Sequence, residues 1–187
     1  MRLDENSIKK YNLTDEEIKL TMSSYKPKSY KANEFFLEEG QVCNAIGFVT
    51  RGLFRSFFYD DHGNEITTDF FPAGTLIIAF DSFNNRTPSR EFIRAIVESE
   101  VMSISYEKQK ELYAKVPAWN QICKDLADVK SHEMTERSKR FQTLSATERY
   151  HLFCKEYPDI LQQATLGHIA SYLGVDIATL SRIRRKK

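Results

Sequence analysis

The stretch from residue 118 to 144, AWNQICKDLADVKSHEMTERSKRFQTL, constrains the fold more than any other part of the chain. It contains no Gly or Pro over 27 positions and is rich in residues that favour helices. At about 1.5 Å per residue, one helix of this length would be roughly 40 Å long, which is longer than a small domain needs. Apolar Ile122, Leu126 and Val129 recur at helical spacing. We therefore predict one long helix that connects two parts of the chain, forms an oligomer seam, or does both.

The part of the chain before this helix has the pattern of a β domain. From about Tyr25 to Ser105, short runs such as EITTDFF and TLIIAF alternate with turn segments such as DDHGN and PAG. Eleven of the 13 Phe lie in this part, so we expect an aromatic core there. Short strands at regular spacing favour a sandwich or barrel. A short helix is predicted before them over residues 14–24, because Thr14 and Glu17 have the spacing of a capping box.

The part after the long helix is predicted to be helical. Ser145 and Glu148 form a second capping box, and Pro158 ends the helix that they begin. From Leu166 to Arg185 the apolar spacing is typical of a helix-turn-helix, in which two short helices pack around a tight turn. The apolar positions are Ile169, Leu173, Val175, Leu180 and Ile183.

Four small or polar residues of this motif support the same prediction. Ala170 is small where the second helix must cross the first, and Gly174 can adopt the positive φ that the turn requires. Thr165 and Asp176 carry the short oxygen-bearing side chains that cap helix N-termini.

The second helix of the motif has an outward face that suits a DNA groove. At 100° per residue, Leu180 and Ile183 point inward. An outward Arg182 can contact guanine in the major groove, and Ala178 or Ile177 can pack on a thymine methyl group. Cations and hydroxyls near the chain end suit phosphates. The candidate DNA-binding residues are Thr165, Ile177, Ala178, Thr179, Ser181, Arg182, Arg184, Arg185, Lys186 and Lys187.

Charge and cysteine content limit the class of protein. The formal net charge is +1, so a nucleic-acid site must depend on where the charges lie rather than on the total. The sequence has no run of 18 apolar residues and no signal-peptide core. Three widely separated cysteines favour reduced thiols over a disulfide framework, a zinc site or an iron–sulfur cluster. We expect a cytoplasmic protein without a cofactor or metal.

Residues from about 25 to 185 resemble the Crp/Fnr family of bacterial transcription regulators. The segments that carry the resemblance are GFVTRG (47–52), DDHGNE (60–65), FFPAGTLI (70–77), ISYEKQKELYAKVP (104–117) and IASYLGVDIATLSRIRR (169–185). The resemblance implies an α+β fold with a cyclic-nucleotide-binding-like β-roll (a jelly roll), a long dimerisation helix and a C-terminal helix-turn-helix. It also implies a homodimer on double-stranded DNA, with RNA polymerase as a further candidate partner. The corresponding domains are residues 1–116, 117–144 and 145–187.

The sequence departs from this family in the ligand cassette. Members that bind cyclic AMP carry a Gly-Glu pair for the ribose and an Arg-Ser pair for the phosphate, where this chain has Ile78-Ala79 and Ser89-Arg90. A buried ribose without its carboxylate would lose about 1–3 kcal/mol or more, so we expect no tight binding of cyclic AMP. An unknown small-molecule effector stays open, with a candidate pocket made of Ile78, Ala79, Ser89, Arg90, Met134 and Thr135.

The end of the chain departs from the family as well. Members generally have a β-hairpin wing after the reading helix, and this sequence ends before one. We expect the RRKK tail to make the phosphate contacts that the wing would make.

Two alternatives from other classes are open to such a chain. The first is a small-molecule sensor module that acts through protein contacts, with weak or lost DNA binding. The second is a cupin-type enzyme, which requires clustered metal ligands. The four His are spread over the chain, so no catalysis is expected. Arg51 and Arg55 are predicted on a solvated strand face, and Trp119 is predicted to pack the long helix onto the β-roll.

Overall fold

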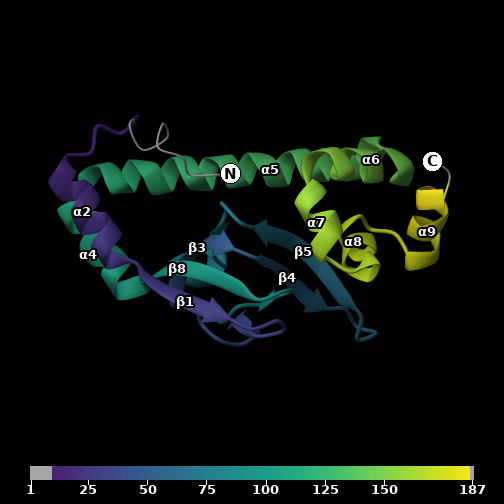
Figure 1. The fold of residues 1–187 in the computed structure, drawn as a ribbon, viewed down its shortest axis with the longest axis horizontal. Helices are drawn as coiled ribbons and strands as arrows, with labels where there is room; N and C mark the ends of the chain where they lie inside the picture. Colours follow the sequence, from purple (N-terminus) through teal and green to yellow (C-terminus); the bar gives the residue numbers. More distant parts are fainter. Residues whose placement is uncertain (1–9, 186–187) are drawn as a thin grey trace.

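The computed structural model describes residues 10–185 and has a β-roll, a long helix and a C-terminal helical part (Figure 1). The strands are β1 (Lys26–Tyr30), β2 (Phe35–Leu37), β3 (Ala45–Arg51), β4 (Leu53–Tyr59), β5 (Glu65–Pro72), β6 (Leu76–Ile77), β7 (Phe92–Ala95) and β8 (Ser99–Ser105). The helices are α2 (Asp15–Ser24), α3 (Phe80–Asn85), α4 (Tyr106–Lys115), α5 (Pro117–Thr143), α6 (Ala146–Glu156), α7 (Pro158–Gln163), α8 (Leu166–Tyr172) and α9 (Ile177–Arg185). The predicted α+β fold class is confirmed.

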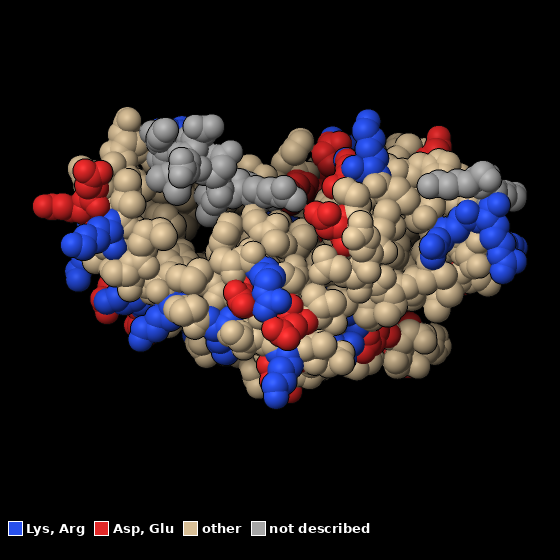
Figure 2. Space-filling model, in the orientation of Figure 1, with Lys and Arg blue, Asp and Glu red and all other residues tan. Residues whose placement is uncertain are grey.

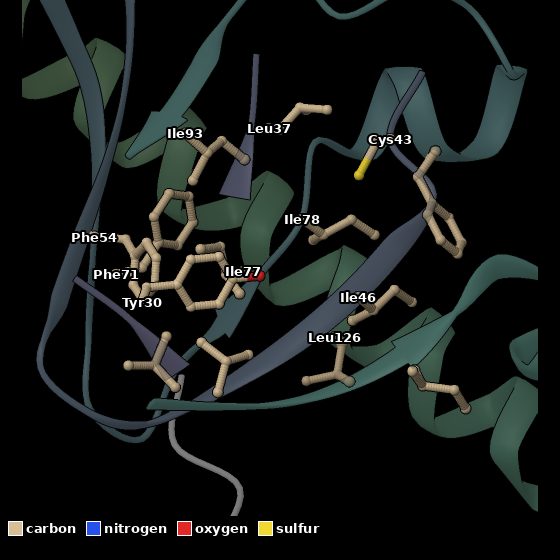
Figure 3. Close-up of a cluster of buried hydrophobic side chains, with 14 of the residues drawn as sticks. Tyr30, Leu37, Cys43, Ile46, Phe54, Phe71, Ile77, Ile78, Ile93 and Leu126 are labelled. Carbon is tan, nitrogen blue, oxygen red and sulfur yellow. The ribbon is translucent and has the colours of Figure 1, made fainter. Parts of the chain in front are cut away.

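The β-roll consists of two four-stranded antiparallel sheets. One sheet has the order β1-β8-β3-β6 and the other, sheet B, has the order β2-β7-β4-β5. Aromatic and branched side chains fill the space between them, as the concentration of Phe predicts (Figure 3). This first core contains Tyr30, Val49, Phe54, Ile77 and Ile93 among its buried members.

The long helix α5 follows the prediction closely, with 27 residues from Pro117 to Thr143. Pro117 begins it because a helix's first residue needs no N–H donor. Trp119, Ile122 and Leu126 are buried in the first core, so the N-terminal half of α5 packs on the β-roll. The helix then runs on to the C-terminal helices (Figure 1). The predicted packing role of Trp119 is confirmed.

A second core lies between sheet B and the C-terminal helices. Leu53 and Phe70 are buried there with residues of α6 to α9, and the Phe70 ring lies 5.2 Å from that of Tyr172 and 6.2 Å from that of Phe153. Strand β4 is therefore buried on both of its faces: Phe54 belongs to the first core and Leu53 to the second. The helical part is packed directly against the β-roll.

This packing corrects one expectation about the strands. Arg51 is exposed and pairs with Glu98 at 2.8 Å and Glu100 at 3.0 Å, as a solvated face implies. Arg55 is only 1% exposed, because the C-terminal helices cover its face of sheet B. It forms an ion pair with Glu65.

Candidate nucleic-acid interface

The turn between α8 and α9 has the geometry that the sequence predicts. Gly174 adopts φ +66°, in the left-handed region that favours glycine. A Cβ at this position would lie 2.7 Å from a ring carbon of Phe141, near the end of α5. Gly174 is therefore required both for the backbone conformation and for the close approach of the Phe141 ring.

Both helices of the motif begin at the predicted caps. The Thr165 side chain accepts a hydrogen bond from the backbone N–H of His168. Asp176 Oδ1 accepts one from the backbone N–H of Thr179 at 2.7 Å. Hydrogen bonds from Thr179, first from its backbone N–H and then from its side chain, lower the pKa of Asp176. Asp176 is thus a stable anionic cap at the positive end of α9.

Helix α9 presents an amphipathic surface at one end of the molecule. Leu180 is completely buried beneath it, whereas Ala178 and Arg182 are exposed and Ile177 is 55% exposed. Basic side chains gather at this end of the molecule (Figure 2). In the last turn of α9 they are Arg182, Arg184 and Arg185.

Arg182 is folded back on its own helix. Its Nη2 donates to Thr179 Oγ1 at 3.1 Å and its Nε donates to the carbonyl of Ala178 at 3.4 Å. Thr179 Oγ1 in turn donates to Asp176 Oδ2 at 2.7 Å. The cap and the candidate base-reading arginine therefore form one chain of hydrogen bonds. Lys186 and Lys187 lie outside the described residues.

A set of polar bonds joins the motif to the β-roll. Ser171 of α8 accepts a hydrogen bond from the backbone N–H of Thr67 at 2.8 Å and donates to the carbonyl of Glu65 at 3.0 Å. Arg137 of α5 donates to the carbonyl of Thr68 and, at 3.1 Å, to that of Tyr172. Its guanidinium also lies 4.1 Å from the centre of the Tyr172 ring. Arg137 thus connects β5, α5 and α8, a set of contacts that we call the Arg137 clamp.

A charged cluster lies under α8, and Arg55 is its one buried member among the three residues Arg55, Glu65 and Arg94. Glu65 pairs with Arg55 and, at 3.2 Å, with Arg94, and the Arg55 guanidinium lies 4.1 Å from the centre of the Phe57 ring. His168 faces this cluster, and its Nδ1 has no hydrogen-bond partner within residues 10–185. Burial and then the charges of Arg55 and Arg94 lower the pKa of His168 to about 4. His168 is therefore neutral at physiological pH.

The residues of the predicted effector pocket are not gathered around one hollow. Ser89 and Arg90 line an open polar hollow of about 480 Å³, together with Glu39 and Asp81. Ile78 belongs to the first core and lines a different hollow, whereas Ala79 is the residue before α3. On α5, Met134 and Thr135 are exposed and line neither hollow.

Together, these parts define a class of architecture: a double-sheet β-roll joined by a long helix to a helix-turn-helix. Residues 27–116 match the cyclic nucleotide-binding domain family. The chain is 24% identical to the anaerobic regulatory protein of Haemophilus influenzae, over 83% of its own length and 64% of that relative's. It is 27% identical to the fumarate and nitrate reduction regulatory protein of Vibrio cholerae, over 82% of its own length and 64% of the relative's.

The solved structures include FixK2 from Bradyrhizobium japonicum, with a TM-score of 0.75 at 17% identity over 87% of this chain and 83% of that one. The chain is thus similar to bacterial regulatory proteins over most of its length, and it shares the fold of FixK2. It spans 64% of the length of the two curated relatives. No helix within residues 10–185 combines the length and hydropathy of a bilayer-spanning segment.

Proposed function

We propose that this protein is a DNA-binding transcription regulator of the Crp/Fnr type, with α9 as the helix that enters the major groove. The observation that carries the proposal is the outward face of α9, where Ala178 and Arg182 are exposed above a completely buried Leu180. An α-helix of this kind fits the major groove, and its outward arginine can pair with guanine O6 and N7. The curated relatives are named as regulatory proteins, which supports the same function.

The residues of α9 divide into two roles in this proposal. Arg182 leaves its bond to Thr179 and contacts a base, while Ala178 and Ile177 pack on thymine methyl groups. Ser181 and Arg185 also face the groove. The phosphate contacts that fix the position of the helix come from Thr165, Thr179, Arg184, Lys186 and Lys187.

The regulator acts as a homodimer along α5 in this proposal. The middle of α5 is solvent-exposed and presents Ala127, Ser131, Met134 and Ser138 on one side, an uncharged stripe at helical spacing. A dimer joined there would place two reading helices about 34 Å apart, on successive major grooves. Its binding site would be nearly palindromic.

The proposed regulator does not depend on cyclic AMP. Ile78, at the family's ribose position, is buried in the first core and supplies no carboxylate. A ribose placed there would have its hydroxyls unpaired, which opposes tight binding.

Selection of bound sequences from random duplex DNA by the full chain tests the proposal. We expect a recovered site with two related half-sites. Arg182→Ala should weaken binding to this site by about 1–3 kcal/mol and relax the preference at one base pair of each half-site. Arg51→Ala is the matched control, since Arg51 is exposed on β3 and pairs with Glu98 and Glu100 away from α9. Failure to enrich any sequence would contradict the proposal, and an equal loss on all sequences with Arg182→Ala would contradict the base-reading role.

A further inference from the structure

A hollow of about 250 Å³ lies where α4 and the N-terminal half of α5 meet the β-roll. Its inner walls are apolar and include the buried side chains of Ile46, Ile78, Phe83 and Leu126. A cavity of about 150 Å³ can hold benzene, so this hollow has room for one substituted ring. It therefore suits the apolar part of a small molecule.

The mouth of the hollow lies on the side of α5 that carries the uncharged stripe. Of the residues that line the hollow, the exposed ones on α5 are Asn120, Lys124 and Ala127. Ala127 is the first residue of the stripe, and the three- and four-residue intervals of the stripe continue backwards to Lys124 and Asn120. The hollow and the proposed dimer seam thus meet in this half of α5.

Lys124 brings an unpaired cation to this place. It is the one charged residue of the described lining, because burial raises the pKa of the Cys123 thiol and raises that of Tyr113 to about 12. Lys124 forms no ion pair with any other residue between 10 and 185. The adjacent carboxylate of Asp125 is bonded instead to Lys10 at 2.8 Å. An anion that reaches the hollow would therefore find a free positive charge.

The proposed dimer brings two such cations together. Helix α9 lies at the far end of α5 from α4, so two α9 helices reach successive grooves of one duplex only if the two α5 helices run parallel (Figure 1). In a parallel twofold seam, each central residue faces its own counterpart. Lys124 then faces Lys124 of the partner subunit. Two like charges repel each other, which opposes the dimer unless anions lie between them.

We propose that each hollow binds a small carboxylate with an apolar ring, and that this ligand binds the dimer in preference to the monomer. The ring occupies the hollow, and the carboxylate lies at the seam beside Lys124 of both copies. Two ligands in one dimer supply two negative charges for two positive ones. A molecule that binds one state better shifts the equilibrium toward that state, so the ligand favours the dimer. This inference rests on the dimer of the proposed function.

The dissociation constant of the dimer provides the test, with benzoate as the probe. Sedimentation velocity of the full chain over a range of protein concentrations gives this constant. Because each dimer takes two molecules, the constant should fall by at least roughly tenfold at benzoate concentrations well above the dissociation constant of benzoate itself. Acetate lacks the ring and benzamide lacks the charge, so both should have little effect. All three are compared at the same ionic strength, since salt alone screens the repulsion.

Two variants on α5 separate Lys124 from the general effect of charge. Lys124→Met removes the repulsion and the cation but keeps a long flexible side chain. It should form a tighter dimer than the unaltered chain without benzoate, and benzoate should no longer tighten it. Lys139→Met is the matched control, because Lys139 is exposed on the side of α5 away from the stripe and pairs with Glu136. It should keep the full response to benzoate.

The possible failures are distinguishable. A chain that stays monomeric under every condition, and also as Lys124→Met, would contradict the dimer of the proposed function. A dimer whose dissociation constant ignores benzoate up to its solubility limit would contradict only the ligand site. An equal effect of benzamide would exclude recognition of the carboxylate, and an equal effect of acetate would exclude the hollow. A response to benzoate that persists in Lys124→Met would place the anion elsewhere.

The exposed Asp128, one turn after Lys124 on α5, defines a rival explanation. If its carboxylate neutralised the paired lysines, Asp128→Asn would weaken the dimer and benzoate would not tighten the unaltered chain. That combination would overturn the proposal. A benzoate response that is retained in Asp128→Asn would support it.

Discussion

At the residue scale, Gly174 combines a backbone requirement with a packing requirement. Its φ of +66° disfavours any side chain, and an added Cβ would lie 2.7 Å from the Phe141 ring. Gly63 also has a positive φ, +79°, but a Cβ added there would have no atom within 4 Å. A substitution at Gly63 therefore measures the cost of the backbone conformation without a packing clash. The two glycines therefore allow the two effects to be separated.

We predict that Gly174→Ala lowers the free energy of unfolding by more than the roughly 1–3 kcal/mol of backbone strain. Gly63→Ala should show the strain alone. Chemical denaturation of both variants gives their losses in free energy of unfolding. The extra loss in Gly174→Ala is the cost of displacing the Phe141 ring. Equal losses for both variants would show that the ring moves aside at no cost.

His168 makes the attachment of α8 sensitive to acid. Its pKa is about 4 in the folded protein, below the ordinary value of 6.5. Between these two values the unfolded chain binds the extra proton, so stability falls as the pH falls from 6.5 to 4. We predict that His168→Gln removes this acid-induced loss of stability, which is up to roughly 3 kcal/mol. The free energy of unfolding of the variant should therefore change less between pH 6.5 and pH 4.

The measurement is denaturant unfolding at several pH values between 4 and 6.5. His151→Gln is the control, since His151 is exposed on α6. If both variants lose stability with acid in parallel with the unaltered protein, His168 does not carry the effect.

Local signals make several residues of the motif predictable. Short-range rules of capping and backbone conformation assign Thr165, Gly174 and Asp176, and each occupies the predicted position. The prediction of a solvated face is wrong for Arg55. Its burial arises from helices about a hundred residues further along the chain, and no local pattern reports such a contact.

At the element scale, the Arg137 clamp holds α5, β5 and α8 together. We predict that Arg137→Met loosens α8 from β5, because the carbonyls of Thr68 and Tyr172 lose a charged donor. Hydrogen bonds to charged groups contribute about 1.5–3 kcal/mol. Hydrogen exchange should therefore accelerate at the amide of Thr67, which is bonded to Ser171.

The matched control is Lys139→Met on the same helix, where Lys139 pairs with Glu136 at the surface. It should leave exchange in β5 and α8 unchanged. The same exchange rates in both variants would mean that the apolar second core alone holds the helices in place.

Helix boundaries show what periodicity and breakers can predict. The lack of Gly and Pro over 27 positions predicts α5 to within one residue at each end. Pro158 is predicted to end a helix, and α6 does end at Glu156, but Pro158 is also the first residue of α7. A proline fits both roles because the first turn of a helix needs no N–H from it. The sequence rule alone therefore does not show that a new helix follows.

At the scale of the whole molecule, the uncharged stripe on α5 that contains Met134 is the contact surface of the proposed dimer. Met134 is 64% exposed in the single chain, which is unusual for a long apolar side chain. We predict that Met134→Glu shifts the protein from dimer to monomer at micromolar concentration, because two like charges would face each other across the seam. Sedimentation velocity measures the change.

His132→Glu introduces the same charge two positions away, on the opposite side of α5, where His132 is also exposed. It should leave the dimer intact. A dimer that survives Met134→Glu would place the seam elsewhere.

The order of domains along the chain is predictable, whereas their packing is not. The resemblance implies three parts in sequence, and the fold contains them. The second core forms because the C-terminal helices cover the face of sheet B that carries Leu53 and Phe70. An antiparallel sheet can leave one face open to water, so strand patterning alone leaves this choice undecided.

The burial of β4 on both faces has a practical consequence for the expression of separate domains. A fragment that stops at residue 144 would expose Leu53 and Phe70 on sheet B, an apolar patch prone to aggregation without its cover. Polar replacements at these two positions would be needed before the β-roll could be handled alone. Cloning boundaries drawn from the domain order would thus cut through a shared interior, and the chain is better treated as one unit of expression.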